Sequence, residues 1–166
     1  MKQHFDVVVL GAGNFGTCLA QHLGSQGNKV AIYAREQKIV DSINQSHINP
    51  VYLSSITLSK NVSAFHLIDN LKDIDADAYL IVIPTQFMRE VLNQAKEFIN
   101  PNSLLIAANK GIEISSQKLP LHIIEDTLGK EAAERAVFLS GPSFAIEVAE
   151  KQPPLFAWQA TLWNLV

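Results

Sequence analysis

The segment Phe5–Ala20, FDVVVLGAGNFGTCLA, decides the fold. A short apolar run typical of a buried strand leads into Gly11, Gly13 and Gly16, and a helix-compatible run follows. Three glycines in the spacing GxGxxG, placed between a strand and a helix, are typical of a turn that binds a dinucleotide pyrophosphate. The first permits the tight turn, the second lets the backbone approach the phosphates, and the third lets the helix pack closely. A plain strand-to-helix turn needs only one glycine, so we favour the dinucleotide turn.

The composition predicts one globular domain. The chain has 166 residues, 48% hydrophobic and 17% charged, which suits one core and is too short for two comfortable ones. A net charge of -3, without any run of lysines or arginines, argues against a nucleic-acid partner. No apolar segment approaches membrane-spanning length, and the N-terminus does not resemble a signal peptide. Cys18 is the only cysteine. We therefore expect a cytoplasmic protein with no membrane partner and no disulfide framework.

Strand-like and helix-like segments alternate along the rest of the chain. Beyond the first strand, strands are predicted at Lys29–Ala34, Val62–His66, Asp77–Ile83, Ser103–Ala108 and Ala136–Leu139. Helices are predicted at Asn14–Gln26, Glu36–Ser46, Thr85–Phe98 and Leu119–Leu128. This alternation predicts an α/β fold with a doubly wound, Rossmann-like parallel sheet in a single domain. In such a sheet, ligands bind beyond the carboxyl ends of the strands.

Two cationic residues follow predicted strands. Arg35 follows the second strand, where the adenosine ribose lies, and it would attract a 2′-phosphate. We therefore predict that NADPH is accepted at least as well as NADH, although a solvated Arg35–Glu36 pair is equally compatible with the sequence. Lys110 follows a later strand and would neutralise a phosphate or polarise a carbonyl oxygen. The alternative for Lys110 is a solvated lysine before a turn glycine.

Other candidate residues have structural alternatives. Phe15 and Phe87 either lie against the cofactor or belong to the core. Ser143 and the N–H groups after Gly141 either bind substrate oxygens or cap a helix. The five histidines have no metal-ligand spacing, so we expect no metal site, and Cys18 is interpreted as a small packed side chain.

Four motifs together resemble one family. GAGNFGT, IPTQFMREVL, NKGIE and LSGPSFAIEVA, in this order and spacing, are similar to the NAD(P)-dependent glycerol-3-phosphate dehydrogenases, particularly the bacterial enzymes. The match covers about Phe5–Ala149. It implies hydride transfer between NADH or NADPH and dihydroxyacetone phosphate or sn-glycerol 3-phosphate, which supplies phospholipid precursors, and a homodimer for the full-length enzymes.

The resemblance also assigns site residues. Besides the three glycines, it implies cofactor contacts from Asn14, Phe15, Arg35, Phe87, Lys110 and Ala145. It implies substrate contacts from Lys110, Gly141 and Ser143, with Lys110 as the catalytic residue present in this chain.

The last residues depart from the family pattern. The family's EVA segment usually continues through Pro-Thr-Ala into another strand, whereas this chain reads PPLFAWQATLW from Pro153. One base restored before the Pro154 codon would allow the family pattern, so we hypothesise a frameshifted gene. We expect a truncated chain, with an NAD(P)-binding domain at residues 1–152 and an atypical tail at 153–166, and with marginal stability because the tail would expose apolar area.

Three functions remain open from the sequence. The family's second, helical domain carries the lysine that transfers the proton, and we do not find that domain in these residues. The leading interpretation is a glycerol-3-phosphate dehydrogenase chain that carries the cofactor-binding domain. The alternatives are a catalytically inactive dinucleotide-binding fragment and a dehydrogenase of a neighbouring family that acts on another hydroxy acid.

Overall fold

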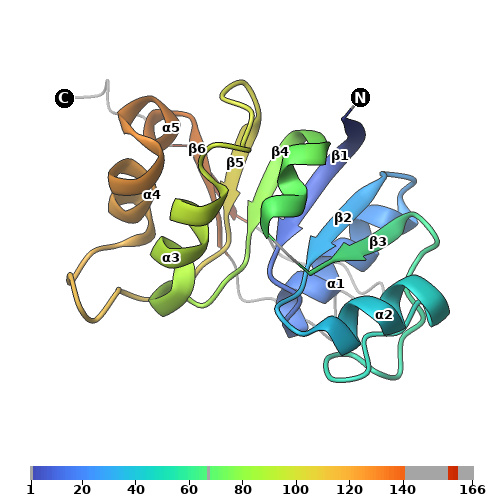
Figure 1. Cartoon of the computed structure of the whole chain (residues 1–166). Coiled ribbons are helices and arrows are strands. Elements are labelled where there is room, and N and C mark those ends of the chain that lie inside the picture. Colours follow the sequence, from blue (N-terminus) through green and yellow to red (C-terminus); the bar gives the residue numbers. More distant parts are fainter. Residues whose placement is uncertain (1, 67, 141–156, 161–166) are drawn as a thin grey trace.

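The computed structural model describes residues 2–66 and 68–140 and the backbone of 157–160 (Figure 1). The strands are β1 (Gln3–Leu10), β2 (Val30–Tyr33), β3 (Val62–Phe65), β4 (Ile74–Ile81), β5 (Leu104–Ala107), β6 (Ala136–Ser140) and β7 (Ala157–Ala160). The helices are α1 (Asn14–Ser25), α2 (Gln37–Ser46), α3 (Thr85–Ala95), α4 (Pro120–Leu128), α5 (Lys130–Glu134) and the 3-10 helix η1 (Ile68–Asp73). Among the residues described, no helix is both long enough and apolar enough to cross a membrane.

All the strands belong to one sheet, in the order β3-β2-β1-β4-β5-β6-β7. Strands β1 to β6 pair in parallel, which confirms the predicted doubly wound sheet. From β1 the chain moves outward to β2 and β3, then crosses back to β4 on the other side of β1. The carboxyl ends of β1 and β4 therefore flank the point where the strand order reverses. Sheets of this kind bind ligands in the crevice at that point.

Helices cover both faces of the sheet and create two cores. The core under α1 and α2 contains Leu19 and Ile43, and the core under η1, α3, α4 and α5 contains Leu92. Figure 1 shows α3, α4 and α5 gathered on one side of the strands and α1 and α2 on the other. The central strand β4 contributes Tyr79 to one core and Leu80 to the other. It is thus buried on both faces, as its near-continuous apolar sequence predicted.

The structure differs from the sequence prediction at a few element boundaries. β4 begins at Ile74, three residues before the predicted start at Asp77, because its amino end pairs with the start of β1. The short elements η1 and α5 were not predicted.

The predicted tail also contains a strand. β7 pairs antiparallel with β6, so an edge strand of opposite direction joins the parallel sheet. Antiparallel edge strands are common on otherwise parallel sheets.

Candidate dinucleotide-binding site

A pocket of about 460 Å³ lies at the carboxyl ends of β1, β2 and β4. Its walls come from the glycine turn after β1, from the end of β2, from the segment after β4 and from one face of α3. The lining contains many of the predicted cofactor residues, namely Gly11, Gly13, Asn14, Phe15, Gly16, Arg35 and Phe87. Segments far apart in the sequence therefore meet at the crevice where the fold predicts a ligand.

The glycine turn has the geometry of an anion site. Gly11 has φ of +123°, and a Cβ there would lie 3.0 Å from the Val82 carbonyl oxygen. A Cβ on Gly16 would lie 1.8 Å from the Gly11 carbonyl oxygen, so this glycine allows α1 to approach the turn itself. Around Gly13, by contrast, a Cβ would meet nothing within 4 Å. Gly13 is the N-cap of α1, without any side-chain cap, and the first turn of α1 carries no acidic residue. The helix N-terminus thus faces open space with N–H groups that favour an anion.

A buried asparagine stabilises the glycine turn through hydrogen bonds. Asn49 is fully buried, and its Nδ2 donates to the Ala12 carbonyl oxygen at 3.1 Å and to Thr17 Oγ1 at 2.9 Å. Its Oδ1 accepts from the backbone N–H groups of Val51 and Tyr52 at 3.2 and 3.0 Å. These bonds bring Tyr52 to the pocket wall. Sequence reasoning missed Tyr52, because it lies in an irregular segment without periodic signal.

Arg35 pairs with Glu36 and also lines the pocket. Its Nη2 lies 3.4 Å from Glu36 Oε1, which is the solvated pair considered from the sequence. The Arg35 side chain is 76% exposed, and both residues also line the pocket. Tyr33 lies on the same wall, where burial raises the pKa of its hydroxyl and the charge of Arg35 opposes that shift. The end of β2 thus offers the pocket a cation, a carboxylate and an aromatic ring.

Helix α3 presents one face to the pocket and another to the core. Phe87, Glu90, Val91 and Gln94 line the pocket at helical spacing, and Phe87 is 50% exposed. The core side of the helix carries Met88, Leu92 and Ala95, all buried. Only Phe87 was singled out from the sequence. The spacing of three, four and seven residues from Phe87 is the signal that could have identified the other three.

Lys110 lies just outside this pocket. Its side chain is exposed and is absent from the pocket lining. Its carbonyl oxygen accepts from Thr85 Oγ1 at 2.8 Å. The neighbouring Asn109 donates through Nδ2 to the Ile83 carbonyl, while its buried Oδ1 has no hydrogen-bond partner among the residues that the structure describes. The catalytic, cofactor and substrate roles of Lys110 stay predictions. Those of Gly141, Ser143 and Ala145 fall outside the described residues.

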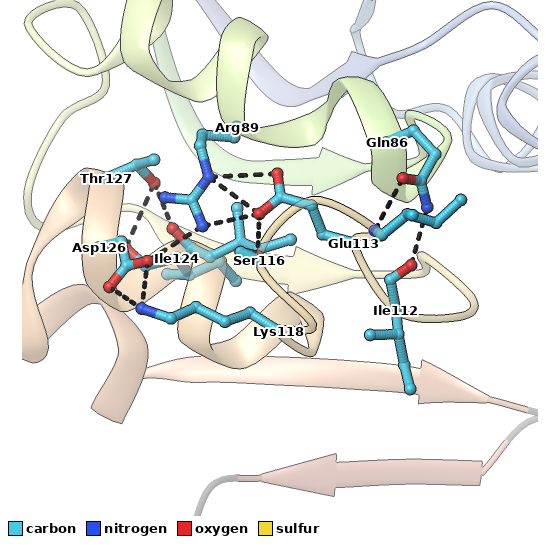
Figure 2. A network of polar contacts seen from close by, with 11 residues as sticks. Gln86, Arg89, Ile112, Glu113, Ser116, Lys118, Ile124, Asp126 and Thr127 are labelled. Carbon is cyan, nitrogen blue, oxygen red and sulfur yellow. Dashed lines mark hydrogen bonds and ion pairs between the residues drawn. The ribbon is translucent and has the colours of Figure 1, made fainter.

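A polar network connects α3 to the segment that follows Lys110 (Figure 2). Arg89 Nε and Nη2 donate to the Glu113 carboxylate at 2.8 to 3.1 Å, and Ser116 also donates to it. Arg89 Nη2 also lies 3.0 Å from Asp126 Oδ2, to which Lys118 Nζ donates. The hydrogen bonds from Arg89 lower the pKa of Glu113, and the hydrogen bond from Lys118 lowers the pKa of Asp126. No pattern in the sequence indicated this network, because its members are separated by loops.

The amino-terminal halves of the central strands β1 and β4 carry a small cluster of side chains of types that can ligate a metal ion. His4, Asp6 and Asp77 each place one ligand atom within 4.8 Å of the others. His4 Nε2 lies 3.4 Å from Asp77 Oδ2, and its Nδ1 lies 3.7 Å from Asp75 Oδ2. His4 was interpreted from the sequence as a bystander, and the structure shows that it has acidic neighbours.

Comparisons with known proteins agree with this geometry. Residues 6–161 match the family model described as the NAD-dependent glycerol-3-phosphate dehydrogenase N-terminus. The chain is 40% identical over 148 residues to the glycerol-3-phosphate dehydrogenase (NAD(P)+) of Neorickettsia sennetsu, and 36% identical over 146 residues to that of Bacillus anthracis. These alignments cover 89% and 88% of this chain but 43% of each relative.

Solved structures give the same result. The glycerol-3-phosphate dehydrogenase of Coxiella burnetii matches with a TM-score of 0.80 and 28% identity, over 93% of this chain and 46% of that one. The enzyme of Saccharomyces cerevisiae matches with a TM-score of 0.73 and 31% identity, over 90% of this chain and 45% of that one. The chain thus spans less than half the length of the relatives that it matches. It belongs to the NAD-dependent glycerol-3-phosphate dehydrogenase family and corresponds to its N-terminal, cofactor-binding domain.

Proposed function

We propose that the pocket beside the glycine turn binds NADPH or NADH, and that the chain serves as the cofactor-binding part of an sn-glycerol-3-phosphate dehydrogenase. The open space over Gly13 at the N-terminus of α1 carries this proposal. A pyrophosphate in that space would accept hydrogen bonds from the free N–H groups of the first helical turn. The positive end of the helix dipole would also stabilise its negative charge. Asn14 and Phe15, which follow in the lining, would contact the cofactor beside the phosphates.

The end of β2 would hold the adenosine. Arg35 is exposed enough to turn toward a 2′-phosphate, while Glu36 beside it would accept from a free 2′-hydroxyl. The arginine favours NADPH and the carboxylate favours NADH. We propose that both cofactors bind, with NADPH held at least as tightly.

The substrate would lie beyond the nicotinamide end, near the carboxyl end of β5. When bound, the nicotinamide supplies or accepts the hydride that interconverts dihydroxyacetone phosphate and sn-glycerol 3-phosphate. Lys110, as an exposed ammonium after β5, would contact both the cofactor and the substrate oxygens. Gly141 and Ser143 would add substrate contacts, and Ala145 a cofactor contact. The homodimer that the resemblance implies would belong to the full-length enzymes.

Binding without turnover is the second candidate function. It is favoured by the position of Lys110, whose side chain is absent from the pocket lining. Both candidates require the same pocket, so cofactor binding alone does not separate them.

Two assays, the first of cofactor binding and the second of turnover, test the proposal. Titration with NADPH and with NADH, followed by cofactor fluorescence, should show saturable binding of both. Oxidation of NADPH in the presence of dihydroxyacetone phosphate then distinguishes an enzyme from a binding fragment, and a rate lost in Lys110→Ala would support turnover by this chain. Failure of both cofactors to bind would refute the proposal, whereas binding without oxidation would select the second candidate.

We also propose a boundary between a dinucleotide-binding domain at residues 1–152 and a tail of altered reading frame at 153–166. β7 pairs with β6 through backbone N–H and C=O groups, which every non-proline residue carries in any reading frame. The family model matches to residue 161 and so runs past this boundary. Sequencing the gene across and beyond the codons for 153–166 tests the frameshift, because one restored base should return the family pattern and open a frame into a lysine-bearing helical domain. Absence of such a frame would refute the altered reading frame.

A further inference from the structure

Three polar side chains of α3 contact the segment that follows β5 and are absent from the pocket lining. Thr85, Gln86 and Arg89 direct their polar groups to the segment 110–114, which follows β5. Gln86 and Arg89 are absent from the pocket lining, although Phe87 and Glu90, on the same helical turn, belong to it. The helix thus divides its side chains among three surroundings. The third of these is the segment that begins with Lys110.

The Gln86 amide binds the backbone of this segment on both sides of Glu113. Its Nε2 donates to the Ile112 carbonyl oxygen at 2.7 Å, and its Oε1 accepts from the Ile114 N–H at 3.0 Å (Figure 2). Only a side chain with a donor and an acceptor can make this pair of bonds, so an amide suits the position. These two hydrogen bonds hold the segment against α3.

The Glu113 side chain also anchors this segment to α3. The carboxylate is 4% exposed and accepts several hydrogen bonds from Arg89, in the fork geometry that fixes direction as well as distance. Thr85 Oγ1 adds a bond to the Lys110 carbonyl at 2.8 Å. Contacts from one helical turn therefore fix the backbone at Lys110 and at the three residues 112–114.

We propose that Gln86 and Arg89 are positioning residues for Lys110. They act without touching the cofactor, by fixing the backbone from which the Lys110 ammonium extends toward the nicotinamide end of the pocket. This proposal rests on the proposed function, because it presumes that Lys110 contacts the bound cofactor. The helix that supplies Phe87 to the pocket would then also set the distance between the pocket and Lys110.

A double-mutant cycle on the full chain tests this role. NADPH dissociation constants are measured for the parent, Gln86→Leu, Lys110→Ala and the variant with both changes. Gln86→Leu should weaken binding roughly fivefold to tenfold, the effect of one or two lost hydrogen bonds. In the Lys110→Ala background the same change should have no further effect, because a positioning residue acts only through the group that it positions.

Two further variants separate positioning from general loss of structure. Lys118→Met removes an ion pair of the same network without touching the contacts to 110–114, and it should bind NADPH as the parent does. Gln86→Glu keeps an acceptor for the Ile114 N–H but cannot donate to the Ile112 carbonyl, so it should recover part of the affinity lost in Gln86→Leu. Amide exchange at Ile114 should be faster in Gln86→Leu than in the parent.

The outcomes are distinct. If Gln86→Leu weakened NADPH binding equally in the parent and in Lys110→Ala, the positioning role would be overturned, and the proposal that the pocket binds the cofactor would stand. Parent affinity in Gln86→Leu, with faster exchange at Ile114, would overturn it as well. Parent affinity in Lys110→Ala would instead remove Lys110 from the site and refute both proposals at that residue.

Discussion

Replacing Gly16 by alanine should destabilise the fold strongly. The new Cβ would lie 1.8 Å from the Gly11 carbonyl oxygen, whereas Cβ contacts under 3.0 Å are essentially never found. The two atoms must separate by at least 1.2 Å, the difference between these distances. No side-chain rotation can separate them, because one atom is a Cβ and the other is a backbone carbonyl oxygen. Gly11 itself already lies close to the Val82 backbone. Overpacking a core typically costs 1–3 kcal/mol, so we expect a loss of about 3 kcal/mol or more in the free energy of unfolding.

Gly13→Ala is the matched control, since it makes the same chemical change three residues earlier. A Cβ there meets nothing within 4 Å, so the free energy of unfolding should stay within about 1 kcal/mol of the parent, the usual range for a changed N-cap. NADPH affinity should nevertheless fall at least about tenfold, because the methyl group would occupy the space of the pyrophosphate. Urea denaturation followed by circular dichroism measures stability, and cofactor fluorescence measures binding. Parent stability in Gly16→Ala would refute the packing argument, and parent affinity in Gly13→Ala would refute the assignment of the phosphate position.

Three further outcomes follow from the same structure. Arg35→Ala should raise the dissociation constant for NADPH and leave that for NADH unchanged; equal constants in variant and parent would remove Arg35 from the site. Asn49→Ala should lower the free energy of unfolding by about 2–3 kcal/mol in urea denaturation, because the Val51 and Tyr52 N–H groups lose their acceptor and the buried Ala12 carbonyl and Thr17 hydroxyl each lose a donor. A loss under about 0.5 kcal/mol would contradict this. Because hydrogen bonds from Arg89 lower the folded-state pKa of Glu113, its contribution to stability is present above pH 4.5, the ordinary value, and is lost as pH falls through the folded-state pKa. Glu113→Gln should flatten that acid limb of the stability profile, and an unchanged limb would show that other carboxylates determine it.

The sequence predicted the sheet and the centre of the site because both depend on local signals. Three glycines at fixed spacing specify the turn, and Arg35 and Lys110 could be placed at strand ends because parallel strands end at one edge. Tyr52 escaped prediction because the contact that brings it to the pocket comes from buried Asn49, which has no periodic pattern around it. The contacts from α3 to the Lys110 segment also escaped prediction, because a loop separates the residues that they join.

The pocket combines segments between Gly11 and Gln94, so no short stretch of the chain can form it alone. It exists only when β1, β2 and β4 lie side by side. A dinucleotide bound there would recognise the folded chain and ignore the unfolded one. At a hundred times its dissociation constant, such a ligand adds about 2.7 kcal/mol to the free energy of unfolding. The cofactor would then stabilise the packing of β1, β2 and β4 against one another, and its cellular concentration would help to determine how much of the chain is folded.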